Sequence, residues 1–138
     1  MTAAEKAPSQ KSFPSRPSQV VCAGMSTWDL IFSVSHHPSD DEKMFASNFT
    51  ACGGGPASNA AVTAARLGVP AAFAGKMGTD HFSRAHEQEL IDAGVDTSLL
   101  VHDGPGMPVS SITVKPDGSR SVVNYRPLKK EEDPLSQP

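Results

Sequence analysis

The sequence has no apolar run long enough to cross a membrane and no excess of positive charge. Its 138 residues include 12 Lys and Arg against 15 Asp and Glu, which gives a formal net charge of −3 at pH 7. A membrane-spanning helix needs about 20 consecutive apolar residues, and nucleic-acid-binding domains typically carry a basic patch or stripe. We therefore expect a protein that binds neither a membrane nor a nucleic acid.

Cysteine is scarce, and the histidines are scattered along the chain. The two cysteines, Cys22 and Cys52, do not match a metal-binding spacing, and neither do the five histidines. The first residues lack the apolar segment of a secretory signal. We expect both cysteines to be buried free thiols in a reducing compartment, which favours a cytoplasmic protein without a metal site in this chain.

Two common nucleotide-binding loops are also missing from the sequence. The segment around Gly75-Lys76 lacks both the first glycine and the Ser or Thr of a Walker A loop. Ser58 stands where the dinucleotide-binding fingerprint needs its third glycine. The sequence therefore does not predict a nucleotide site of either kind.

The feature that stands out is a glycine run that leads into a helical pattern, CGGGPASNAAVTAARLG at Cys52–Gly68. Glycine has no Cβ, so Gly53–Gly55 can take positive φ and let a ligand approach the main chain. Pro56 suits the first helical position, and alanines then recur on one helical face until Gly68 ends the helix. Asn59 lies in the first turn, beside unpaired N–H groups. This segment indicates either a ligand-binding turn or a tight loop before a closely packed helix.

Hydrophobic patterning predicts an α/β fold with a partly parallel sheet. Strands are expected at 19–24, 28–34, 70–75 and within 95–102, and helices at 56–67 and 81–93. A strand at 44–52 and a hairpin at 109–125 fall outside this alternation, and we expect them to form a small separate sheet. The polar segments 1–18 and 128–138 predict disordered tails around one domain at 19–127.

Two aspartates occupy informative places in this pattern. Asp29 interrupts an apolar strand near its start, where a carboxylate has to be solvated, paired or used for binding. Asp80 precedes the second expected helix and is a good candidate for its N-cap.

Taken in order, these motifs resemble the PfkB-type carbohydrate kinases, the ribokinase-like family. The segment GGGPASNAAVTAARLG is similar to the first signature of this family. The resemblance extends to GMSTWD at 24–29, GKMGTD at 75–80, GVDTS at 94–98 and DGSR at 117–120, and it covers about 19–127.

The resemblance implies a three-layer α/β/α, Rossmann-like domain with a small β-sheet lid over a sugar site. The implied reaction is transfer of the γ-phosphoryl group of ATP to a sugar hydroxyl, assisted by Mg²⁺. Asp29 matches the aspartate whose carboxylate accepts hydrogen bonds from the sugar. Gly54 and Gly55 match the pair whose backbone approaches the sugar, and Asn59 matches the asparagine that also contacts it.

Within the family, the pattern is most similar to ketose-directed members. The GGGPA run, the preceding Asn48-Phe49-Thr50 and the segment at 123–125 resemble fructose-type (ketohexokinase-like) and sulfofructose kinases. Lys43 is then a candidate contact for an anionic group on a sugar phosphate or sulfonate; the alternative is a solvated lysine, because exposed lysines are the rule. A fragment of an adenosine-type nucleoside kinase is a further alternative.

The second signature of the family, D-T-x-G-A-G-D, does not occur in these 138 residues. In the family it supplies the general base and a helix N-terminus that binds anionic oxygens. The resemblance therefore implies the N-terminal portion of a kinase, with no catalytic base of its own and no activity alone. The full-length protein is expected to form a homodimer through the lid. The alternative is a naturally short, non-catalytic module that binds a partner through exposed lid strands.

Overall fold

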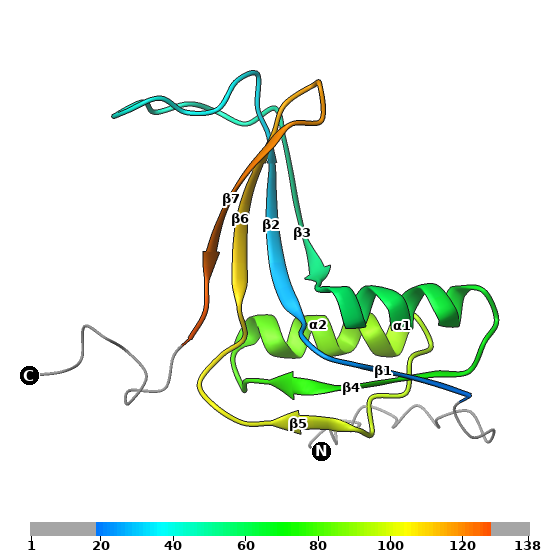
Figure 1. Cartoon of the computed structure of the whole chain (residues 1–138). Coiled ribbons are helices and arrows are strands. Elements are labelled where there is room, and N and C mark those ends of the chain that lie inside the picture. The colour runs from blue at the N-terminus through cyan, green and yellow to red at the C-terminus, as the bar shows by residue number, and fades with distance from the viewer. Residues whose placement is uncertain (1–18, 128–138) are drawn as a thin grey trace, which may run out of the picture.

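The computed structural model describes residues 19–127, and the tails expected at 1–18 and 128–138 lie outside this range. The chain forms a body and a taller, separate sheet that we call the lid (Figure 1). In chain order the elements are β1 (Val20–Ala23), β2 (Thr27–Ser33), β3 (Asn48–Gly54), α1 (Pro56–Arg66), β4 (Ala71–Met77), α2 (His81–Asp92), β5 (Leu100–His102), β6 (Val109–Val114) and β7 (Arg120–Tyr125).

The body is a parallel three-stranded sheet in the order β1-β4-β5. Both helices lie on the same face of this sheet, so residues 19–127 contain two of the three layers expected for the fold (Figure 1). None of the helices in this range is long and apolar enough to cross a membrane.

The core of the body lies between this sheet and the helices. The buried cluster comprises Ala61 from α1, Phe73 and Met77 from β4, Leu90 from α2 and Val95. Burying each of the four larger side chains contributes about 1.5–3 kcal/mol. The cluster fixes both helices on the sheet, and α1 therefore begins at a defined point beside the lid.

The lid is a four-stranded sheet in the order β3-β2-β6-β7. Strand β2 pairs antiparallel with β3 and parallel with β6, and β6 pairs antiparallel with β7. The run expected as a strand at 28–34 thus belongs to the lid. Only Gly24–Ser26 separates it from β1, whereas a parallel neighbour in the body sheet would need a crossover of a dozen or more residues.

Strand β3 differs in its bounds from the strand expected at 44–52. Its ladder with β2 begins at the pair Ser33–Asn48 and ends at the pair Thr27–Gly54. The length of β2 sets both limits, so residues 44–47 belong to the preceding loop and the first two glycines of the run belong to the strand.

Both helices begin where the sequence predicts. Pro56 is the first residue of α1, and Gly68 follows its last turn with a φ of 83°. Asp80 is the N-cap of α2, where its Oδ1 accepts the N–H groups of Phe82 (2.7 Å) and Ser83 (3.1 Å). These local signals therefore place α1 and α2 correctly.

Candidate functional site

The lid brings Asp29 and Gly54 together although they are 25 positions apart in the sequence. Asp29 lies on β2 and Gly54 ends the neighbouring β3. A Cβ added to Gly54 would lie only 2.2 Å from Asp29 Oδ2, so the carboxylate occupies the space above the glycine. The Thr27 hydroxyl donates a hydrogen bond to Asp29 Oδ1 at 2.9 Å. Asp29 therefore presents an oriented carboxylate beside bare main chain.

The three glycines of the run meet two different structural demands. Gly55 has a φ of 103°, a conformation that favours glycine. Gly53 and Gly54 have no positive φ and lie in β3, where the absence of a Cβ leaves room for other side chains. Positive φ, expected as possible for all three, is thus required at Gly55, and close approach explains the other two.

Asn59 lies in the first turn of α1, where its own N–H donates to the Gly55 carbonyl at 3.0 Å. Its side chain is exposed. The preceding residue, Ser58, was missed by the sequence reasoning. Its buried hydroxyl donates to the carbonyls of Gly54 (2.6 Å) and Gly55 (3.1 Å), and so fixes the turn. The available signal was a serine in the first helical turn, where its hydroxyl readily bonds backbone groups.

Lys43 is the one candidate that the structure does not bring to this site. It is exposed in the loop that joins β2 to β3. This loop lies at the end of the lid opposite to the start of α1 (Figure 1). A seven-residue strand is about 20 Å long, so the length of β2 separates this loop from Thr27 and Gly54. The geometry gives the Lys43 assignment no support within one chain.

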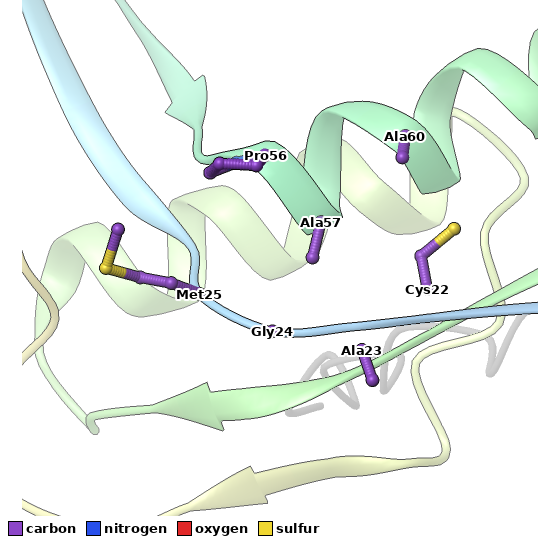
Figure 2. Close-up of a pocket in the computed structure, with 7 residues that line it drawn as sticks. All are labelled: Cys22, Ala23, Gly24, Met25, Pro56, Ala57 and Ala60. Atoms are coloured by element: carbon purple, nitrogen blue, oxygen red, sulfur yellow. The ribbon is translucent and has the colours of Figure 1, made fainter.

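Two cavities flank the segment that leads from β1 into the lid. One, of about 350 Å³, lies between this segment and the first turns of α1, and Ala57 points from the helix toward Gly24 (Figure 2). The other, of about 470 Å³, lies at the carboxyl ends of β1 and β4, the edge where open α/β sheets bind ligands. The larger cavity is lined by residues 24–26, Lys76, Met77, 103–106, Pro108, Arg126 and Pro127.

Asp80 ties the body to the lid in addition to capping α2. Its Oδ2 accepts the Ser83 hydroxyl (2.8 Å) and the N–H of Met107 (2.9 Å), which lies just before β6. Partial burial raises the pKa of the Asp80 carboxyl, but the hydrogen bonds from Ser83, Phe82 and Met107 outweigh it, and the net pKa lies below its usual value. The carboxylate is therefore charged at neutral pH and holds the start of the lid hairpin on the body.

Two further residues of α2 contact the glycine run and were not predicted. Glu89 Oε2 accepts the N–H of Gly53 at 2.7 Å. The ring of His86 is 3% exposed, lies edge-on to Trp28 and has no hydrogen-bond partner at either nitrogen among residues 19–127. Burial lowers the pKa of His86, an effect that the nearby carboxylates of Glu89 and Asp29 only partly oppose. The imidazole is therefore neutral at pH 7.

We expect this histidine to make the chain less stable in mild acid. The unfolded state takes up a proton as the pH falls through the ordinary histidine pKa of about 6.5, whereas the folded state resists it. The free energy of unfolding should therefore fall below pH 6.5, and by less in a His86→Leu variant. Urea unfolding at pH 7.5 and 5.5 measures both, and the same loss in the two proteins would contradict the assignment to His86.

The described part of the chain contains no cluster of metal-ligating side chains. Within residues 19–127, no three His, Cys, Asp or Glu side chains are close enough together to hold one. The site itself offers a carboxylate that accepts hydrogen bonds, open backbone and the N-terminus of α1.

Comparison with known proteins agrees with these features. The family model for pfkB family carbohydrate kinases matches residues 17–137. Fructokinase-1 of Oryza sativa subsp. japonica is 40% identical over 82 residues, which are 59% of this chain and 25% of that protein. The chain thus spans about a quarter of the length of the curated relatives it matches.

Solved structures show the same fold. A protein from Agrobacterium tumefaciens described as a ribokinase superposes with a TM-score of 0.73 and 26% identity, over 82% of this chain and 40% of that one. The Arabidopsis thaliana ribokinase, complexed with ribose and ATP, superposes with a TM-score of 0.67 and 23% identity, over 80% of this chain and 36% of that one. The fold is therefore ribokinase-like, and the chain belongs to the pfkB family of carbohydrate kinases.

Proposed function

We propose that this chain supplies the sugar-binding part of an ATP-dependent kinase that phosphorylates a sugar hydroxyl. The observation that carries the proposal is the Asp29 carboxylate held over the bare backbone of Gly54, at the point where α1 begins. An ionised carboxylate accepts strong hydrogen bonds from hydroxyl groups. A polyol that rests on the glycines would bring its hydroxyls within reach of this carboxylate.

Each residue of the proposed site has a distinct task. Asp29 binds and orients hydroxyls, Gly54 and Gly55 let the sugar approach the main chain, and Asn59 offers an amide from the first turn of α1. Phosphoryl transfer depends mainly on positioning and on charge stabilisation. Within residues 19–127 we assign no general base, so the residues of this chain bind and position the acceptor.

ATP and Mg²⁺ belong to the proposal for the complete enzyme. When bound, ATP supplies the γ-phosphoryl group and Mg²⁺ neutralises the charge that develops on it. Support comes from family membership and from the ribose and ATP complex of the Arabidopsis thaliana ribokinase. This chain alone is proposed to be inactive, and the complete kinase to be cytoplasmic.

For the acceptor we propose a ketose, or a ketose that carries a phosphate or sulfonate group. The similarity to rice fructokinase-1 supports the unsubstituted ketose over ribose or adenosine. Release of ADP by the full-length polypeptide should depend on the sugar, and fructose-type ketoses should have the highest kcat/KM in a panel with ribose and adenosine. Activity on adenosine alone would favour the nucleoside-kinase alternative.

The lid also supports a proposal about partners. All six residues of β7 are exposed, including Val123 (71%) and Tyr125 (63%). Strands β3 and β7 are the two edges of the lid sheet, and unpaired strand edges are templates for association. We propose that the full-length kinase forms a homodimer through this sheet.

The same surface favours one alternative function, a non-catalytic module that binds a partner kinase. Size-exclusion chromatography with light scattering distinguishes the two proposals. A dimer of the full-length polypeptide supports the homodimer, and a complex of the 138-residue chain with a full-length kinase supports the module. A 138-residue chain that stays monomeric and does not bind the full-length kinase would contradict the proposal of a binding module.

A further inference from the structure

Helix α2 belongs to the body, but two of its side chains contact the last part of lid strand β3. Glu89 bonds the N–H of Gly53, and the ring of His86 occupies the space beside the same residue. A Cβ added to Gly53 would lie 1.6 Å from His86 Nδ1 and 2.8 Å from Glu89 Oε2. Side chains of α2 therefore occupy the space that a Cβ of Gly53 would need.

The hydrogen bond from the Gly53 N–H to Glu89 replaces the bond that a neighbouring strand would otherwise accept. Strand β3 is an edge of the lid within the described range 19–127, so in this range its outward N–H groups have no neighbouring strand to bond. The Glu89 carboxylate accepts one of them at 2.7 Å, a length typical of strong bonds to a charged acceptor. His86 Nδ1 is 3.9 Å from the same carboxylate oxygen, too far for a hydrogen bond, so the ring acts by packing.

This contact lies one residue from the proposed sugar site. Gly54 follows Gly53 directly, and its Cα faces Asp29 Oδ2. Any outward movement of β3 at Gly53 would change the separation between the Gly54 backbone and the Asp29 carboxylate. Errors of about 1 Å in the placement of reacting groups can cost roughly 100-fold in rate.

We propose that Glu89 is a positioning residue for the sugar site, which fixes the Gly53 N–H and thereby the spacing between Gly54 and Asp29. The inference rests on the proposed function for its effect on the sugar. The contact between Glu89 of α2 and Gly53 of the lid is independent of that function. Glu89 reaches the sugar only through the backbone, so its loss should raise the KM for the sugar and leave the KM for ATP unchanged.

The test uses three variants of one helix. Glu89→Ala removes the acceptor, and Glu89→Gln keeps an acceptor oxygen without the charge. Glu87→Ala is the matched control, because it removes the same charge from α2 while its carboxylate faces His102 at 3.5 Å. The first measurement is amide hydrogen exchange at Gly53 in the 138-residue chain without ligand. We expect Glu89→Ala to speed exchange at least about tenfold, and Glu87→Ala to leave it unchanged.

The second measurement is steady-state kinetics of the full-length polypeptide with its preferred sugar. Glu89→Ala should raise the sugar KM about tenfold or more, which corresponds to a loss of about 1.4 kcal/mol in binding, and Glu89→Gln should recover most of that loss. An unchanged exchange rate at Gly53 in Glu89→Ala would contradict the proposal that Glu89 fixes the Gly53 N–H, irrespective of the kinetic result. Faster exchange with an unchanged sugar KM would overturn the positioning role. A wild-type polypeptide that phosphorylates no sugar would contradict the proposed function, while the exchange result still decides the hold on Gly53.

Discussion

Replacement of Asp29 with alanine is expected to raise the sugar KM at least about 100-fold or to abolish turnover. Hydrogen bonds to a charged acceptor contribute about 1.5–3 kcal/mol each, and every 1.4 kcal/mol is about a factor of ten in affinity. Loss of two such bonds to sugar hydroxyls therefore accounts for the effect. The ladder hydrogen bonds of β2 are formed by its backbone, so the substitution should leave the lid in place.

The controls separate binding from folding. Asp40→Ala removes an exposed carboxylate from the loop at the far end of the lid and should leave the kinetics unchanged. Asp29→Asn keeps the shape of the side chain and should retain part of the affinity, since an amide oxygen still accepts hydrogen bonds. Steady-state kinetics of the full-length polypeptide with the sugar varied measures all three. Wild-type kinetics in Asp29→Ala would refute the assignment of this residue.

A second large effect is expected from Gly53→Ala, this time on folding. The added methyl group would overlap the ring of His86, whose Nδ1 lies 1.6 Å from the Cβ position. Overpacking of this kind typically costs about 1–3 kcal/mol. The ring is 3% exposed and packs against Trp28, so it has little room to move. We expect the urea concentration at the midpoint of unfolding of the 138-residue chain to fall because of this loss of stability.

A double-mutant cycle tests the cause of that loss. His86→Ala removes the ring that the new methyl group would strike, so Gly53→Ala should cost much less in the His86→Ala background. The coupling between the two sites should be about 1 kcal/mol or more, as for other residues in contact. Additive effects, with Gly53→Ala equally damaging in both backgrounds, would rule out the clash with the His86 ring as its origin.

The elements that the sequence predicts correctly are those encoded by neighbouring residues. Asp80 caps α2 through N–H groups two and three positions away, and Pro56 begins α1 directly after the glycine run. The hairpin strands β6 and β7 pair across the expected turn. In each case the residues that carry the signal lie close in sequence to the structure that they specify.

What the sequence could not predict depends on partners far along the chain. The bond between Gly53 and Glu89 joins residues 36 positions apart, and nothing local indicates that His86 is buried against the same glycine. The distance of Lys43 from Asp29 follows from the length and register of the β2–β3 ladder, which propensity alone does not set. Family resemblance placed Asp29, Gly54, Gly55 and Asn59 in one site, and the fold brings these four to the same end of the lid.

The most direct test of this account is an NMR titration of the full-length polypeptide with its preferred sugar, without ATP. We expect the backbone amides of Gly54 and Gly55 and the side-chain amide of Asn59 to shift with one common dissociation constant. The resonances of Lys43 and its loop should stay in place, and Asp29→Ala should abolish the shifts. Sugar-dependent shifts that leave Gly54, Gly55 and Asn59 unchanged would show that the sugar binds elsewhere and would contradict the account.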